Sequence, residues 1–162
     1  MKRKEKYDLF VQFYKEGIEL KKSLENKATV NLSLLSLFVT GIFFNEKKLL
    51  DLIDLISIPN WIFFSLIGMC LFMMVLCLVF TINIFIGKRY KFLIPNNYMQ
   101  IFFSNKFNSP HSQYDELILN LKLSIDCNAS LNKNKSQYLR WSQLFLILSL
   151  IDSLIILSLI TI

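Results

Sequence analysis

The sequence feature that most constrains this chain is an uncharged stretch, residues 58–87. A helix rises about 1.5 Å per residue and needs about 20 apolar residues to cross the roughly 30 Å hydrocarbon core of a bilayer. The stretch is longer than a single span requires, so we expect it to tilt or to protrude. It predicts a transmembrane helix.

The remaining composition extends this interpretation to the whole chain. Hydrophobic residues make up 54% of the sequence and charged residues only 19%, with 15 Phe, 4 Gly and 3 Pro. Few helix breakers and many apolar side chains favour long helices. The apolar residues gather in three blocks separated by charged segments, which is typical of a membrane protein. We therefore predict an all-α integral membrane protein with three transmembrane helices and cytoplasmic amphipathic helices.

The pattern of charge and polarity divides the chain into seven segments. In order, they are a cytoplasmic amphipathic helix (1–27), transmembrane helix 1 (28–44), an external connector (45–58), transmembrane helix 2 (59–87), a cytoplasmic loop (88–111), a cytoplasmic helix (112–143) and transmembrane helix 3 (144–162). The alternative for the first apolar block is a cleavable signal peptide. The long amphipathic leader and the lack of a small-x-small cleavage pattern after Phe44 argue against it.

Orientation follows from the Lys and Arg residues. Residues 1–27 contain 8 of them and residues 88–141 another 8, whereas the connector contains only Lys47 and Lys48. The positive-inside rule predicts a multi-pass membrane protein with its N-terminus cytoplasmic and its C-terminus external. The same distribution explains the net charge of +6. We therefore expect the lipid bilayer, and no nucleic acid, as a partner.

Two cytoplasmic segments carry apolar residues at helical spacing, and we predict that these residues pack. They are Phe10, Phe13, Tyr14, Ile18, Leu117, Leu121 and Ile125. The N-terminal helix either lies on the membrane surface or packs against another cytoplasmic helix. Its polar side mixes acids with bases, which favours packing, because surface-binding helices are usually basic.

Catalysis finds little support in the sequence. It contains no Gly-rich phosphate loop, no HExxH and no GxSxG pattern. The single His111 lies in a Pro-Ser loop, and the 3 cysteines form no disulfide framework or zinc motif. We predict that the protein is not an enzyme and that it holds no cofactor or metal.

Asp152 is the most informative single residue, because it is the one charge in the third apolar block. A carboxylate at the bilayer centre costs about 2.5–3.5 kcal/mol on the most lenient scale. Three interpretations stay open: a neutral Asp152 that only holds helices together, a role in lining a pore or closing an oligomer, and a block that is not a span. Ser149 and Ser153 lie on neighbouring faces.

The other two blocks also carry polar residues at helical spacing. Ser33, Ser36 and Thr40 form a seam on the first block, and Asn83 lies near the inner end of the second. Small hydroxyl residues at this spacing usually mark a contact between helices. The alternative is that these residues line a conduction path.

Three stretches carry a resemblance to a known family. They are Glu25-Asn26-Lys27-Ala28-Thr29, the loop from Pro95 through Ile101-Phe102-Phe103 to Tyr114-Asp115-Glu116-Leu117, and Ile125-Asp126-Cys127-Asn128-Ala129 followed by Lys133 and Lys135. This arrangement resembles the small bacterial membrane effectors of anti-phage defence, above all the transmembrane domain of the Pycsar effector and related CBASS and retron effectors.

The resemblance implies a membrane-disrupting or pore-forming effector of the bacterial inner (cell) membrane, which stays silent until triggered and then acts as a homo-oligomer. From the sequence we expect no separate β-rich domain that binds a cyclic nucleotide. A nucleotide signal would therefore have to be sensed by the cytoplasmic helices or by a cytoplasmic sensor protein. The alternative is a non-enzymatic membrane adaptor or assembly subunit whose helices recruit a cytoplasmic partner.

Overall fold

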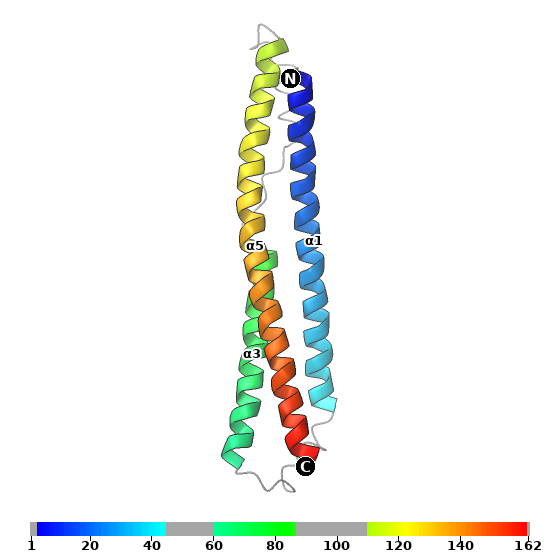
Figure 1. Cartoon of the computed structure of the whole chain (residues 1–162), viewed down its shortest axis with the longest axis vertical. Helices are drawn as coiled ribbons and strands as arrows, with labels where there is room; N and C mark the ends of the chain where they lie inside the picture. The colour runs from blue at the N-terminus through cyan, green and yellow to red at the C-terminus, as the bar shows by residue number, and fades with distance from the viewer. Residues whose placement is uncertain (1–2, 45–59, 87–109, 162) are drawn as a thin grey trace. The chain divides into compact units, whose positions relative to one another are not determined.

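A computed structural model describes residues 3–44, 60–86 and 110–161, and all of them are helical. The helices are α1 (Arg3–Phe44), α3 (Asn60–Ile86) and α5 (Pro110–Thr161) (Figure 1). The all-α prediction is confirmed for these residues. The predicted external connector and nearly all of the predicted cytoplasmic loop lie outside them.

Two helices continue across the predicted boundaries between a cytoplasmic helix and a transmembrane helix. α1 passes from residue 27 to 28 and α5 from residue 143 to 144 without interruption. No Gly or Pro stands at either boundary, so nothing in the backbone ends the helix there. α5 also begins at Pro110, two residues before the expected start at Ser112. Proline suits a first helical position because its φ is already helical and its missing N–H would have had no acceptor.

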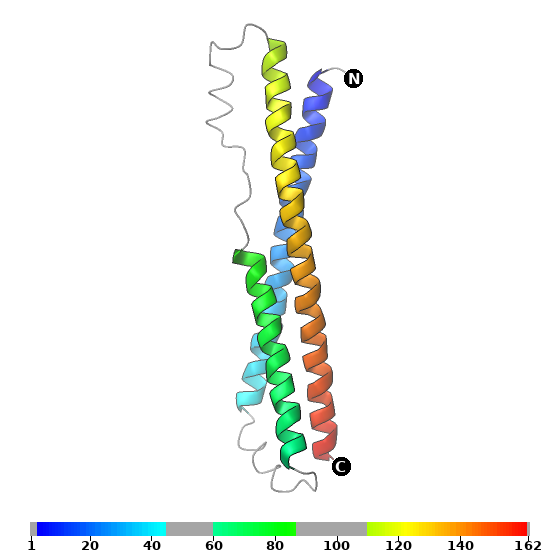
Figure 2. The same cartoon turned by 90° about the vertical axis from the view of Figure 1, so that its left-hand side faces the viewer.

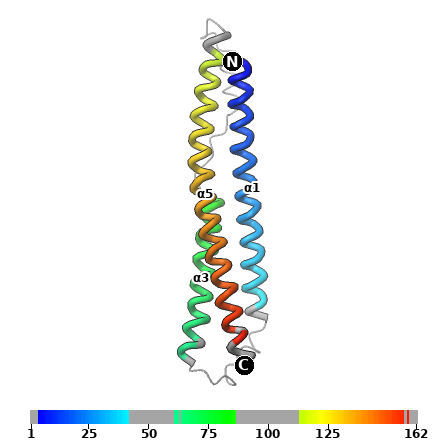
Figure 3. The backbone as a smooth tube through the Cα atoms, in the orientation of Figure 1, coloured from blue at the N-terminus to red at the C-terminus, as the bar shows by residue number. Residues whose placement is uncertain are grey.

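The chain forms two compact units. The first comprises Met1–Leu24 and Gly87–Lys135, and the second comprises Glu25–Ile86 and Ser136–Ile162. α1 and α5 each contribute residues to both units, whereas α3 belongs to the second. Figure 3 traces the backbone of the three helices.

In the first unit, α1 and α5 form a parallel pair. The rings of Tyr7 and Tyr114 meet edge to face with their centroids 5.9 Å apart. Further along both helices, Asn132 Nδ2 donates a hydrogen bond of 2.9 Å to the Gly17 carbonyl oxygen. The contacts advance in the same direction on both helices, which establishes the parallel arrangement (Figure 2).

The pair follows a heptad repeat, in which buried positions a and d alternate every three and four residues. The positions on α1 are Tyr7, Phe10, Tyr14, Gly17, Lys21 and Leu24, and those on α5 are Tyr114, Ile118, Leu121, Ile125, Asn128, Asn132 and Lys135. All of these residues are buried or half-buried. The pair is therefore a short coiled coil with an unusually polar seam on its α5 side.

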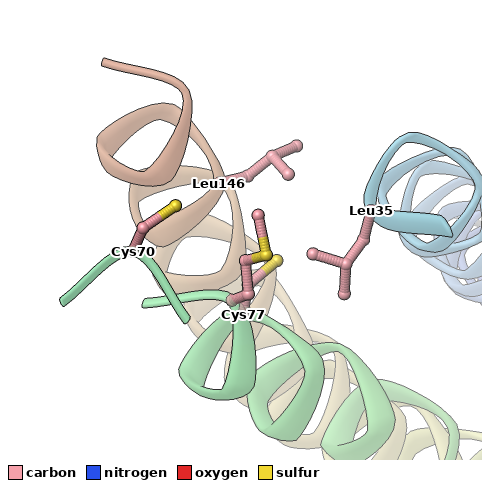
Figure 4. Close-up of a cluster of buried hydrophobic side chains, with 5 residues drawn as sticks. Leu35, Cys70, Cys77 and Leu146 are labelled. Carbon is pink, nitrogen blue, oxygen red and sulfur yellow. The ribbon is translucent and has the colours of Figure 1, made fainter. Parts of the chain in front are cut away.

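The second unit is a three-helix bundle with the same repeat. Its a and d positions are Ala28, Asn31, Leu35 and Phe38 on α1, Ile67, Cys70, Met74, Cys77, Thr81 and Ile84 on α3, and Leu139, Ser142, Leu146, Ser149, Ser153 and Ile156 on α5. α3 runs antiparallel to α5, since Cys77 contacts Ser142 and Cys70 contacts Ser153. Leu35, Cys77 and Leu146 converge in the apolar part of this core (Figure 4).

Two helices contain segments long and apolar enough to cross a membrane, Phe64–Ile86 and a part of Gln113–Ile156. A core helix of a soluble protein or a signal sequence can meet the same criterion. Here, however, only 28% of the most apolar window of each helix is buried. Most of the side chains in these windows are therefore not buried by the rest of the described chain. The first predicted span, residues 28–44, is not among these segments and stays a prediction.

Candidate functional site

The second unit contains a buried hydrogen-bond chain that joins all three helices, which we call the Ser142 network. Asn31 Nδ2 of α1 donates to Ser142 Oγ of α5 at 3.1 Å. The oxygens of Ser142 and Thr81 of α3 lie 2.6 Å apart, and Thr81 Oγ1 donates to the Cys77 carbonyl oxygen at 2.8 Å.

The direction of each bond follows from the hydroxyl protons. A hydroxyl group has one hydrogen to donate. Because the Thr81 hydrogen goes to the Cys77 carbonyl, Ser142 must be the donor in its bond to Thr81. The Cys77 thiol, 3.5 Å from Ser142 Oγ, is then left as a weak donor to that oxygen. The network therefore runs in one direction, from Asn31 through Ser142 and Thr81 to the backbone of Cys77.

The Ser142 network is enclosed by protein. Ser142 and Thr81 are completely buried and Asn31 nearly so. Hydrogen bonds between apolar-embedded helices contribute on average about 0.6 kcal/mol and at most about 1.7 kcal/mol. Because the partners lie on three different helices, the network stabilises one register of the bundle over its neighbours.

A second polar layer lies further along α5. Ser149 Oγ donates to the Leu146 carbonyl at 2.8 Å, and Ser153 Oγ donates to the Ser149 carbonyl at 2.7 Å. Cys70 Sγ of α3 lies 3.3 Å from Ser153 Oγ and 3.7 Å from the Ser149 carbonyl oxygen. The hydroxyl groups of Ser149 and Ser153 therefore both donate to backbone carbonyls of α5. Their contact with α3 is made through the Cys70 thiol.

Asp152 also lies in this layer, but one of its carboxylate oxygens has no hydrogen-bond partner there. The residue is 4% exposed, and its Oδ2 atom has no hydrogen-bond partner among the described residues. It lies one heptad after Phe145, whose ring stacks on Phe80 of α3 at 5.6 Å. The repeat thus places Asp152 on the α3 side of α5. An unsatisfied buried polar atom typically costs about 1–3 kcal/mol.

The other polar residues singled out from the sequence lie on outer faces. Ser33, Ser36 and Thr40 are exposed on α1, and Asn83 is exposed on α3. Ser33 Oγ donates to the Thr29 carbonyl at 3.1 Å, and Thr40 Oγ1 to the Ser36 carbonyl at 2.8 Å. Asn83 Nδ2 donates to the Val79 carbonyl at 2.8 Å. Ser33, Thr40 and Asn83 therefore each donate their hydrogen bond to a backbone carbonyl of their own helix.

The predicted cytoplasmic packing residues occupy different depths in the first unit. Leu117 and Leu121 are buried, and Phe10, Tyr14, Ile18 and Ile125 are half-buried. Phe13 is 45% exposed and lies at heptad position g of α1, beside the seam.

Sequence reasoning missed Thr81 and Ser142, and it assigned no packing role to Asn128, Asn132 or Lys135. Thr81 occupies a seam position of the heptad repeat on α3, and the other four occupy a or d positions of the repeat along α5. The alternation of three and four residues was the signal that would have found them.

The described residues contain no group of three or more His, Cys, Asp or Glu side chains that could hold a metal ion. Comparison with models of protein families, with curated proteins and with solved structures found no match to this chain.

Proposed function

We propose that this protein is a membrane-disrupting or pore-forming effector of a bacterial anti-phage defence system, which acts as a homo-oligomer when triggered. The observation that carries the proposal is the buried polar core of the second unit, with an unsatisfied oxygen on Asp152. The defence role rests on the resemblance of the sequence to small membrane effectors.

In this proposal the described bundle is the closed form. Its polar side chains are turned inward and are sealed by the contacts between helices. If the helices separate and assemble with further copies, Asn31, Thr81, Ser142, Ser149 and Asp152 supply a polar surface for a water path. Water then solvates Asp152 Oδ2, so the penalty of about 1–3 kcal/mol for its unsatisfied state is relieved on opening. Asp152 thus favours the open form.

The membrane topology is part of the proposal. We place three spans in the bilayer, with the N-terminus cytoplasmic and the C-terminus external. Packing supports including residues 28–44, because Ala28, Asn31 and Leu35 are buried in the same core as the two more apolar helices. The excess of Lys and Arg in residues 1–27 and 88–141 supports the orientation.

The first unit is the proposed control element. Asn128, Asn132 and Lys135 occupy its seam, where apolar residues would pack more strongly. A polar residue at a seam position specifies register at a cost in stability. A signal that changes the packing of this pair, brought by a sensor protein or a nucleotide, would act through α1 and α5, which also supply two helices of the bundle.

The proposal is tested by expressing the full chain in bacteria from a tight promoter while recording membrane potential and dye entry. Three variants accompany the wild type: Asp152→Leu, a deletion of residues 1–24, and Asn83→Leu. Asn83→Leu is the matched control, since it removes an exposed polar residue that is bonded only to its own helix. We expect rapid depolarisation by the wild type and the control, and its loss in Asp152→Leu and in the deletion. An intact potential with the wild type at high expression contradicts the effector proposal.

A specific observation favours a second function, that of a membrane adaptor. Leu9, Phe13 and Leu20 project from one side of α1 in the first unit and are 40%, 45% and 51% exposed. Large apolar side chains outside the bilayer are a surface on which a cytoplasmic helix of another protein can dock. An adaptor is tolerated at high expression and leaves the potential intact, so the same recording separates the two functions.

A further inference from the structure

An aromatic cluster lies at one end of the second unit. Phe80 of α3 stacks on Phe145 of α5, and the Trp141 ring stacks on both, with centroids 6.1 Å from Phe145 and 6.4 Å from Phe80. Tyr138 packs on Phe80 at 6.3 Å. Trp141 remains 51% exposed. Exposed Trp and Tyr side chains at the end of an apolar helix lie at the level of lipid headgroups. The cluster therefore marks the boundary at which α5 enters the proposed bilayer.

Two cations lie at this boundary on neighbouring helices. The bond between Asn31 and Ser142 aligns α1 with α5. Lys27 precedes Asn31 by four residues and Arg140 precedes Ser142 by two, so their backbones differ in height by about 3 Å at 1.5 Å per residue. Both side chains are exposed.

The heptad positions place both cations beside the groove between α1 and α5. Lys27 is at position g, which in a parallel pair faces position e of the partner helix. On α5 the e position at this height is Gln143, and Arg140 lies three residues before it on the adjoining face. Lys27 and Arg140 therefore flank the same groove.

No acid on these faces balances the two charges. At this height the c positions of α1 are Ser23 and Val30, and the e positions of α5 are Ser136 and Gln143. Glu25 lies at position e of α1, on the side away from this groove. No ion pair joins Lys27 or Arg140 to the described part of the chain. Two like charges held together at a headgroup boundary are stabilised by an anion that bridges them, and a guanidinium binds a phosphate through two parallel hydrogen bonds.

We infer that Lys27 and Arg140 bind the headgroup phosphate of an anionic phospholipid from the cytoplasmic leaflet, with Trp141 at the level of its upper acyl chain. The cytoplasmic leaflet is the source that fits, because it presents anionic phosphates at the height of the aromatic cluster. A phosphate held by both cations ties α1 to α5 on the outside of the bundle, about one turn before the Ser142 network. This site rests on the proposed insertion of the second unit in a bilayer.

The chain contains two tryptophans, Trp61 and Trp141, which makes a fluorescence test possible. The full chain carrying Trp61→Phe is reconstituted in phosphatidylcholine vesicles that contain phosphatidylglycerol, and either lipid is supplied with brominated acyl chains that quench tryptophan. We expect brominated phosphatidylglycerol to quench Trp141 several-fold more, per mole of lipid, than brominated phosphatidylcholine. The reciprocal Trp141→Phe protein, which reports on Trp61 near the other end of α3, should show no preference.

The double variant Lys27→Gln with Arg140→Gln should lose this preference. Its matched control is Lys15→Gln with Lys22→Gln, which removes two exposed cations of α1 in the first unit and should retain it. Equal quenching by the two lipids, or a preference that survives the double variant, overturns the lipid site but leaves insertion intact. Displacement of the preference by inorganic phosphate in excess overturns the assignment to a lipid. Failure of every brominated lipid to quench either tryptophan overturns the proposed insertion itself.

Discussion

Removing the Ser142 hydroxyl tests the packing of the bundle most sharply. In Ser142→Ala, Asn31 Nδ2 loses its acceptor while still buried, whereas Thr81 keeps its bond to the Cys77 carbonyl. One strong donor, the Asn31 amide, is thus left unsatisfied, besides the weakly donating Cys77 thiol. Such a donor costs about 1–3 kcal/mol in a soluble core, and hydrogen bonds between transmembrane helices are worth at most about 1.7 kcal/mol. We therefore expect a loss of about 1–2 kcal/mol in the free energy of unfolding.

A double-mutant cycle separates this bond from other effects of truncation. Asn31→Ala, Ser142→Ala and the double variant are unfolded by SDS titration in mixed micelles, with helicity followed by circular dichroism. We expect a coupling energy of about 0.6–1.7 kcal/mol between the two positions. Ser33→Ala is the control and should stay within about 0.5 kcal/mol of the wild type, because Ser33 is exposed and bonded only to its own helix. A coupling energy below about 0.3 kcal/mol, which is within additivity, refutes the reasoning.

Three further predictions concern local packing. A Cβ at Gly17 meets nothing within 4 Å, so Gly17→Ala should stabilise α1 by up to about 1 kcal/mol, seen as slower amide hydrogen exchange in residues 3–24; faster exchange contradicts this. Leu121 is completely buried, and Leu121→Ala should cost about 2–5 kcal/mol in thermal or chemical unfolding; a cost below about 1 kcal/mol shows that the α1–α5 seam is not formed as described. Cys127 is half-buried whereas Cys70 and Cys77 are buried, so a maleimide should label Cys127 first in the folded protein; equal rates contradict the bundle core.

The helices themselves could be predicted from the sequence, because long apolar runs with few Gly and Pro residues favour long helices. Leu117 and Leu121 lie inside the first unit, where helical spacing of large apolar residues placed them. The heptad repeat was present in the sequence as well. It was obscured because many of its positions hold Asn, Lys, Ser, Thr or Gly in place of Leu or Ile.

The outward faces could not be predicted from polarity alone. Ser33 and Thr40 look like contact residues, yet each hydroxyl is satisfied by the carbonyl four residues earlier on its own helix. A serine or threonine with such an acceptor carries little preference for either face. The larger side chains decide the rotation of α1, and Ala28, Asn31 and Leu35 take the inner positions.

Asp152 shows the limit of reasoning from one helix. Its cost in an apolar environment can be estimated from the sequence, but which neighbours surround it depends on how α3 packs against α5. The stacking of Phe80 on Phe145 fixes that arrangement and places the carboxyl group beside α3 with one oxygen unsatisfied.

The conductance of the purified full chain in a planar lipid bilayer tests the central proposal most directly, with Asp152→Leu and Asn83→Leu measured beside the wild type. The proposal predicts that the wild type and Asn83→Leu conduct ions, and that Asp152→Leu falls to the level of a protein-free bilayer, because leucine removes the buried oxygen that favours opening. Equal conductance in Asp152→Leu and the wild type, or no conductance from the wild type, would contradict it.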